Sequence, residues 1–315
     1  MKSKIEALKK ELTKALIGQE NMIEGLLIGL LCDGHILVEG VPGLAKTTTI
    51  NALSSAIGLD SKRIQFTPDL LPSDIIGAEV YNPQDHSFSI KKGPLFTHLL
   101  LADEINRAPA KVQSALLEVM QERQVSIGNE TFKLDKPFLV MATQNPIEQE
   151  GVYALPEAQL DRFMMKIVVK HNSEEDEITI MRKAAEKSFE EVEAILSIED
   201  LISLQEELST IHIDEELERY MVRLIRATRE PEYFGLKNLA DSIMFGASPR
   251  ASIDLYKASK AQAFLKDKTF VSPSDIANVI YKVLRHRIVL SYEARAKGVT
   301  ADEVISTILE TLPVP

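Results

Sequence analysis

Apolar positions in the first part of the chain change from a helical to a strand-like spacing. From Ile5 to Leu16 they recur every three or four residues, and a second pattern of this kind runs to Asp33, so we expect two helices here. The short apolar run from Ile36 to Val38 then predicts a strand, and the sequence from Lys46 to Ile57 predicts another helix. Buried strands that alternate with helices are typical of an α/β domain.

The turn between that strand and that helix has the composition of a phosphate-binding loop. Residues 35–49 read HILVEGVPGLAKTTT, in which Gly40, Lys46 and Thr47 match the pattern G-x-x-x-x-G-K-[ST], whereas Ala45 stands where the second glycine is expected. Backbone N–H groups at a helix start converge on an anion, and the helix dipole reinforces them. The stretch predicts nucleotide binding, with an ordinary strand-to-helix turn as the alternative.

A second chemical signal follows the apolar run from Leu99 to Ala102. This run predicts a strand buried in a parallel sheet, and Asp103 and Glu104 come at its carboxyl end, where open α/β sheets bind ligands. Asp103 is placed to hold a magnesium ion, and Glu104 to orient or deprotonate a water that attacks a γ-phosphate. Lys46 would neutralise phosphate charge together with the metal. An acidic helix start gives the same pattern, but its place after the loop favours nucleotide hydrolysis.

A third signal and two unusual stretches complete this half of the chain. A predicted strand from Phe138 to Ala142 delivers Asn145 to the same sheet edge, where its amide could touch the γ-phosphate or the water. As the residue before a proline, it is equally typical of a turn. Residues 67–93 predict a long, irregular, non-helical excursion, and residues 124–134 predict a hairpin.

Beyond residue 171 the pattern changes to helices alone. A polar break is followed by acidic residues that suit a helix start, and apolar spacing predicts helices from there to residue 311. Residues 230–247 predict an irregular connection that leads to Arg250. This is the composition expected of a helical lid that closes on a nucleotide.

The composition limits the class of protein further. The 315 residues, 45% of them hydrophobic, favour two domains. A net charge of -11 argues against a surface that binds nucleic acid or anionic membranes indiscriminately. The single cysteine, Cys32, leaves neither a disulfide nor a thiolate metal cluster within the chain. The start lacks the apolar core of a signal peptide and no apolar stretch is long enough to span a bilayer, so we expect a soluble, cytoplasmic protein.

In their order along the chain, these motifs resemble the MoxR family of AAA+ ATPases. The motifs are GVPGLAKT (40–47), LLLADEINRAP (99–109), ATQNP (142–146), LPEAQLDRF (155–163) and GASPRA (246–251). The resemblance covers nearly the whole chain, and Ala45 in place of glycine is a common variant in this family. It implies a P-loop α/β domain with a five-stranded parallel sheet over residues 1–172, including the inserts 67–93 and 124–134, and an all-α lid over residues 173–315.

The resemblance also implies roles for the matching residues of the loop and the acidic pair. Lys46 and Thr47 match the Walker A lysine and the hydroxyl on the magnesium side, and Asp103 and Glu104 match the Walker B pair. Residues implied to contact ATP are Ile17 and Gly18 at the adenine pocket, and Gly40, Pro42, Gly43, Leu44, Ala45, Lys46, Thr47 and Thr48 at the phosphates.

Three further residues match positions that complete an AAA+ site. Asn145 matches sensor 1, Arg162 matches the arginine finger that enters a neighbouring subunit's site, and Arg250 matches the sensor 2 arginine, in its own subunit or the next. From the residues alone, Arg162 could instead pair with Glu157 or Asp161, and Arg250 could be solvated at a helix start.

The function implied is Mg²⁺-dependent ATP hydrolysis by a ring, expected to be a hexamer, coupled to chaperone-like remodelling, maturation or activation of a protein complex. The implied partner is a protein client, often one with a von Willebrand factor A domain. A nucleic-acid motor would need strongly basic inserts, whereas residues 67–93 hold only Lys91 and Lys92 as cations and the tip at residues 128–130 holds none. A nucleotide-dependent switch with little turnover fits less well, because Glu104, Asn145 and Arg162 are all present.

Overall fold

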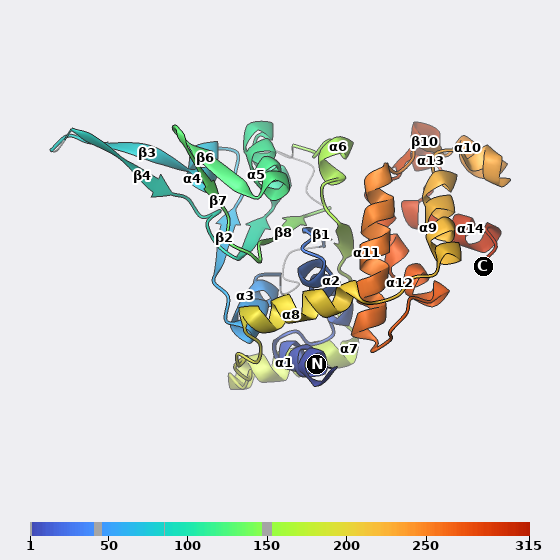
Figure 1. Cartoon of the computed structure of the whole chain (residues 1–315), viewed down its shortest axis with the longest axis horizontal. Helices are drawn as coiled ribbons and strands as arrows, with labels where there is room; N and C mark the ends of the chain where they lie inside the picture. Colours follow the sequence, from blue (N-terminus) through green and yellow to red (C-terminus); the bar gives the residue numbers. More distant parts are fainter. Residues whose placement is uncertain (1, 41–45, 85, 147–152) are drawn as a thin grey trace. The chain divides into compact units, whose positions relative to one another are not determined.

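The computed structural model describes residues 2–40, 46–84, 86–146 and 153–315 (Figure 1). Its contacts divide the chain into two compact units. The first comprises Met1–Leu155 and Ile167–Leu201, and the second comprises Pro156–Lys166 and Ile202–Pro315. Contacts therefore group residues 173–201 with the first unit, whereas the domain boundary between residues 172 and 173 stays a prediction.

The first unit is built on a parallel sheet whose strand order is β2-β5-β8-β1-β9. The strands are β2 (Ser61–Gln65), β5 (Leu99–Asp103), β8 (Leu139–Gln144), β1 (Ile36–Glu39) and β9 (Met165–Val168). Leu99 to Ala102 and Val140 to Ala142 are buried because these inner strands are covered on both faces. The predicted five-stranded α/β fold is confirmed.

The register of the strands brings their carboxyl ends to one edge of the sheet. Gln65 lies opposite Asp103 in the β2–β5 pair, and Ala102 lies opposite Ala142 in the β5–β8 pair. In the β1–β8 pair, Glu39 lies opposite Gln144. Side chains that end or follow these strands are therefore neighbours in space although they are far apart along the chain.

Helices flank this sheet, and the inserts extend from it. The helices of this unit are α1 (Lys2–Ala15), α2 (Glu20–Leu31), α3 (Lys46–Ile57), α4 (Pro72–Ile76), η1 (Ile105–Arg107), α5 (Ala110–Glu122), α7 (Glu174–Glu186) and the first residues of α8 (Ile198–Ser209). The short α6 (Glu157–Leu160) and the rest of α8 belong by contact to the second unit.

The excursion at residues 67–93 is more regular than its prolines suggest, so the prediction of a non-helical stretch is wrong. Pro72 starts the short helix α4, because proline is tolerated in a first helical turn. The antiparallel strands β3 (Gly77–Asn82) and β4 (Ser87–Lys92) follow. The predicted hairpin at residues 124–134 is confirmed as β6 (Gln124–Ile127) and β7 (Glu130–Lys133). The two hairpins lie side by side (Figure 1).

The second unit is mostly helical, with one correction to the prediction of helices alone. Strands β10 (Ile243–Phe245) and β11 (Val289–Leu290) form a short antiparallel pair. Its other elements are η2 (Pro231–Phe234), α9 (Glu215–Ala227), α10 (Lys237–Ala240), α11 (Pro249–Leu265), α12 (Pro273–Leu284), α13 (Tyr292–Ala296) and α14 (Ala301–Thr311). The stretch 230–247 is thus partly regular, because η2, α10 and β10 lie within it.

A buried histidine fastens α5 to the sheet of the first unit. His35 is 5% exposed, its Nδ1 accepts the backbone N–H of Val140 at 3.0 Å, and its Nε2 donates to the carbonyl of Met120 at 3.0 Å. Only a neutral imidazole can accept at one nitrogen and donate at the other. Burial, with the nearby charge of Arg123, lowers the pKa of His35 from 6.5 to about 3.

This arrangement predicts acid sensitivity. His35 in the unfolded chain binds a proton near pH 6.5, whereas folded His35 does not until about pH 3. The free energy of unfolding should therefore fall as the pH drops from 6.5 toward 3, by about 1.4 kcal/mol per pH unit. In His35→Gln, an amide can make both contacts without titrating. Thermal unfolding at pH 7 and pH 5 should show a smaller loss of Tm in His35→Gln than in the wild type. The same change at exposed His171 serves as the control, and equal losses in all three proteins would contradict the assignment.

Candidate active site

The carboxylates of Asp103 and Glu104 are organised by one buried hydroxyl. The Thr143 side chain on β8 is 0% exposed. Its Oγ1 donates to Oδ1 of Asp103 at 2.6 Å and accepts the backbone N–H of Glu104 at 2.9 Å. Thr143 therefore fixes both the direction of the Asp103 carboxylate and the path of the chain where it leaves β5.

That path is unusual at Glu104. The residue has φ 55° and ψ 51°, which lie in the left-handed region that residues other than glycine seldom adopt. Its carboxylate Oε2 accepts from Nε2 of Gln65 at 2.7 Å and from Nη1 of Arg107 at 3.1 Å. Strain of this kind is typical of residues that are held in place for chemistry.

Strand β2 contributes two neighbouring side chains to the same edge. Arg63 donates to Oδ2 of Asp103 from Nη2 at 2.7 Å and from Nε at 3.2 Å. It also donates to Oε1 of Gln65 at 2.8 Å, which leaves the amide nitrogen of Gln65 facing Glu104. Because Arg63 and Gln65 are two residues apart on a strand, their side chains share a face. A single row of polar contacts therefore joins Asp103 to Glu104.

Lys46, the first residue of α3, extends toward this row. Its Nζ donates to the carbonyl of Gly40 at 2.5 Å, at the opposite end of the loop that was predicted to bind phosphate. Burial lowers the pKa of Lys46, while Asp103, Glu104 and Glu39 act in the opposite direction. The ammonium group is therefore within the electrostatic reach of both candidate carboxylates.

The other residues expected to contact phosphate are described only in part. Thr47 is half-buried and Thr48 is exposed, both in the first turn of α3. Pro42, Gly43, Leu44 and Ala45 lie outside the described residues. Asn145 is 7% exposed and directly follows β8, so it comes at the sheet edge where it was expected.

The segment expected at the adenine pocket is held by the chain that follows β9. The side-chain amide of Asn172 donates to the carbonyl of Ile17 at 3.1 Å, and Gln19 donates to the side-chain oxygen of Asn172. Gly18 has φ +70°, and a Cβ there would come within 2.5 Å of the carboxylate of Asp176. Any other residue at position 18 would be strained in this conformation and would force the Asp176 side chain to move.

The second unit holds the two predicted arginines. Arg162 is half-buried between α6 and β9, and Arg250 is in the first turn of α11. The N-cap of α11 is Ser248, which accepts the N–H of Arg250 at 3.2 Å and donates to Oδ2 of Asp161 at 2.9 Å. The guanidinium of Arg250 lies 3.5 Å from the same carboxylate. Asp161, the neighbour of Arg162, therefore links the two motifs.

The segment that leads to Arg250 passes very close to the backbone of Thr228 at Gly246. A Cβ at this position would lie 2.3 Å from the carbonyl oxygen of Thr228. The Thr228 hydroxyl accepts the N–H of Ala247 at 2.9 Å and donates to the carbonyl of Ile225 at 2.7 Å. Glycine therefore lets the segment that carries Arg250 lie against the end of α9.

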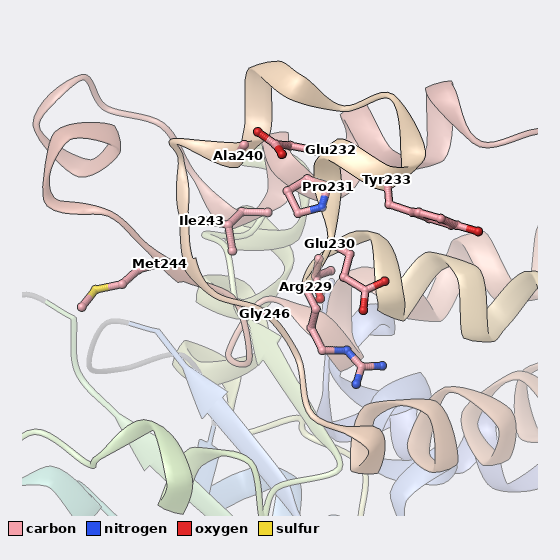
Figure 2. Close-up of a pocket in the computed structure, with 10 residues that line it drawn as sticks. Arg229, Glu230, Pro231, Glu232, Tyr233, Ala240, Ile243, Met244 and Gly246 are labelled. Atoms are coloured by element: carbon pink, nitrogen blue, oxygen red, sulfur yellow. The ribbon is translucent and has the colours of Figure 1, made fainter.

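An open pocket of about 410 Å³ lies beside this segment, within the second unit. Figure 2 shows the side chains of Met244 and Tyr233 pointing away from each other at its two sides. Its lining includes the carboxylates of Glu230 and Glu232 and the guanidinium of Arg229, and this net negative charge disfavours an anionic ligand such as a nucleotide phosphate. The pocket is therefore a poorer candidate for a nucleotide than the sheet edge of the first unit.

Sequence reasoning did not assign roles to Arg63, Gln65 and Thr143. Thr143 directly follows the predicted strand from Phe138 to Ala142, which was a usable signal. The contact of Arg63 and Gln65 with Asp103 and Glu104 depends on β2 pairing with β5. That pairing cannot be read from the spacing of the motifs.

The side chains at the sheet edge fit a magnesium nucleotide. Asp103 and Thr47 offer oxygen donors, which are the ligands that Mg²⁺ prefers, and Mg²⁺ commonly takes only one or two of them from a protein because phosphates and waters supply the rest. Lys46 supplies a cation at the start of a helix that follows a parallel strand. These are the donors expected from the sequence, and their role at a metal ion stays a prediction.

Comparison with known proteins gives independent matches to both units. A family model described as the ATPase family associated with various cellular activities (AAA) matches residues 35–165, and one described as an AAA lid domain matches residues 237–308. Chaperone MoxR1 of Mycobacterium tuberculosis is 48% identical over 97% of this chain and 81% of its own length. The uncharacterized protein YeaC of Bacillus subtilis is 41% identical over 97% of this chain and 93% of its own length.

A solved structure also resembles the whole chain. It is the crystal structure of a protein from Cytophaga hutchinsonii that is provisionally described as an ATPase. The two share 50% sequence identity with a TM-score of 0.94, over 100% of this chain and 96% of the other. In the described part of the present chain, no helix is long and apolar enough to cross a membrane.

The bridging role of Thr143 can be tested without any ligand. Thr143→Val keeps the shape but removes both hydrogen bonds, which should lower the free energy of unfolding in urea by about 1–3 kcal/mol. Thr143→Ser keeps the hydroxyl, so hydrogen exchange at the amide of Glu104 should be slow in this variant and fast in Thr143→Val. Equal exchange rates in the two variants would mean that the hydroxyl does not hold Glu104.

Proposed function

The chain belongs to the MoxR family of AAA+ ATPases, and we propose on that basis that it hydrolyses ATP with Mg²⁺ at the carboxyl edge of the first unit's sheet. The observation that supports this most is the bridge from Asp103 through Thr143 to the backbone of Glu104. It fixes the direction of the Asp103 carboxylate and the backbone from which the Glu104 side chain extends. The two carboxylates can serve different tasks, one on a metal ion and one on a water.

The proposed roles follow from the position of each group. Lys46 neutralises phosphate charge at the start of α3, and Thr47 and Asp103 supply oxygens for the magnesium ion. When bound, the ion would neutralise the charge that develops on the phosphate oxygens. The remaining phosphate contacts are assigned to the loop, including Gly40 and Thr48, and the adenine contact to Ile17 and Gly18.

Glu104 is the proposed base for the attacking water. Its carboxylate Oε2 is held by Gln65 and Arg107 at 2.7 Å and 3.1 Å. In the proposed reaction the carboxylate exchanges at least one of these partners for the water. Asn145, at the end of the neighbouring strand, is assigned the contact with the γ-phosphate or the water.

The arginines extend the proposal to an assembly. We assign Arg162 as a finger that acts on the nucleotide of an adjoining subunit, and Arg250 as a nucleotide contact whose subunit is left open. A finger supplied by a neighbour makes hydrolysis depend on association. The proposed assembly is a ring, because Arg162 would then serve the next site around a closed circle. We take the ring to be a hexamer, as the family resemblance implies.

For the biological role we propose chaperone-like remodelling or maturation of a protein complex in the cytoplasm, where ATP is at hand. Chaperone MoxR1 carries a chaperone's name, and it is similar to this chain along nearly its whole length. The β3–β4 hairpin presents exposed Val80, Tyr81 and Phe88, with the rings of Tyr81 and Phe88 paired across the strands at 5.2 Å. Such an apolar tip suits a protein client, and we propose a von Willebrand factor A domain as its partner.

Removing the proposed base should separate binding from turnover. Glu104→Gln keeps a side chain that can contact Gln65 and Arg107 but cannot accept a proton, so ATP should bind with near-normal affinity while hydrolysis falls by about 10²-fold or more. Nucleotide binding by calorimetry and phosphate release measure the two quantities. Glu118→Gln, on the exposed face of α5, is the control. Retained turnover in Glu104→Gln would exclude Glu104 as the base.

Removing the proposed finger should affect turnover only in the assembly. Arg162→Ala should bind ATP nearly as the wild type does. In the wild type, specific activity should rise as a higher protein concentration favours assembly, and Arg162→Ala should lose this rise. Well-characterised arginine fingers raise kcat by about 10³–10⁵. Arg223→Ala, an exposed arginine of α9, is the matched control. A specific activity that rises normally in Arg162→Ala would exclude a finger at this position.

A further inference from the structure

Arg287 is a buried arginine that the proposed mechanism does not use. It follows the end of α12, and its side chain is only 1% exposed. Its Nε donates to Oδ1 of Asp161 at 2.8 Å, and its Nη2 donates to Oδ2 of Asp254 at 2.5 Å. All of these residues belong to the second unit. A guanidinium held between two carboxylates is strongly oriented, because each contact is a charge-assisted hydrogen bond.

The same guanidinium also binds the backbone on both sides of Arg162. It donates to the carbonyls of Asp161 at 3.1 Å, Phe163 at 2.9 Å and Met164 at 3.3 Å. A fourth carbonyl, that of Val283 at 2.9 Å, ties it to the last turn of α12. The short segment that contains Arg162 is therefore fastened to a lid helix at the residues that precede and follow it.

The two residues before Arg287 add contacts of the same kind. Nε2 of His286 donates to the carbonyl of Phe163 at 2.9 Å, and Nη1 of Arg285 donates to that of Lys166 at 3.3 Å. Burial, with the charge of Arg287, lowers the pKa of His286 well below its ordinary value, so its ring stays a neutral donor. The sequence Arg285-His286-Arg287 thus forms a continuous clamp on the segment at residues 161–166.

The clamp extends to the other predicted arginine. Asp161 accepts from Arg287 and Ser248, and it lies 3.5 Å from Arg250. Asp254 lies one helical turn after Arg250 on α11, so both face the same side. Arg162, Arg250 and Arg287 are therefore parts of one connected body within the second unit.

We propose that Arg287 is a positioning residue for Arg162, and that it makes the finger an integral part of the lid. The proposal rests on the function proposed above for Arg162. It follows that hydrolysis in one subunit depends on the folded state of the lid of its neighbour. Displacement of a catalytic group by about 1 Å can lower a rate by about 10²-fold, so loosening the clamp should lower kcat.

A purely structural role is the competing explanation, and the second unit contains a matched control for it. Asp275 is 0% exposed and pairs with Lys268 at 2.8 Å and Lys266 at 3.3 Å at the start of α12. This is also a buried ion pair of the lid, but both lysines lie outside the segment at residues 161–166. Asp275→Asn should lower Tm without changing kcat.

The test uses two variants of the clamp in the full-length chain. Arg287→Lys keeps the charge but cannot reproduce the planar set of donors. Asp254→Asn loosens the guanidinium without touching the segment, and it serves if Arg287→Lys fails to fold. Both should lower kcat, by about 10-fold to 10²-fold, with KM for ATP nearly unchanged. A kcat equal to that of Asp275→Asn at a similar loss of Tm would overturn the proposal.

Mixing subunits separates positioning of the finger from damage to the variant's own site. Glu104→Gln subunits lack the base but carry an intact finger, whereas Arg287→Lys subunits carry an intact base and a misplaced finger. Their mixture should hydrolyse ATP faster than the sum of the two proteins measured alone. Rates that merely add would overturn the proposal.

The same mixture made with Arg162→Ala distinguishes the possible failures. If Arg162→Ala with Glu104→Gln recovers activity but Arg287→Lys with Glu104→Gln does not, the finger assignment stands and the positioning role of Arg287 is wrong. If neither mixture recovers activity, the finger proposed for Arg162 is itself wrong, and the positioning role is excluded with it.

Discussion

The in-register pairing of parallel strands is the constraint on which the candidate active site depends. Asp103, Gln65 and Thr143 belong to three different strands, and they meet because β2, β5 and β8 end at one edge. Strands β5 and β8 are buried on both faces, whereas the edge strand β2 buries Ile64 between the exposed Arg63 and Gln65. A slip of β2 by one residue would therefore turn Ile64 out and a polar side chain in. The core of the first unit therefore determines which polar groups are neighbours at its edge.

Much of this edge could be predicted from the sequence, because apolar runs reveal buried strands and polar residues at their ends reveal the functional side. Asp103, Glu104 and Asn145 were found in this way. The partners on β2 were not, because strand order is a property of the fold and not of any one segment. The short β10–β11 pair was also missed, since strands of two or three residues carry too little periodicity to detect.

The clamp around Arg287 could not be predicted from the sequence for a different reason. An Arg-His-Arg run near the end of an amphipathic helix is most simply a solvated last turn, because cations are favoured there. Its contacts with residues 161–166 join positions more than 110 residues apart, and nothing in either local pattern refers to the other. Buried charge can be recognised from sequence only when its partner is already known, since lysine and arginine are otherwise mostly exposed.

The contacts of Asp103 and Glu104 divide into fixed and exchangeable ones. Thr143 is fully buried and holds Oδ1 of Asp103 and the backbone of Glu104, whereas the side chains of Arg63 and Arg107 are 51% and 40% exposed. Ion pairs as exposed as these contribute about 0–1 kcal/mol, so a divalent cation on Asp103 can displace Arg63 at little cost. The carboxylates can therefore change partners while the backbone beneath them keeps its geometry, because the two sets of contacts use different atoms.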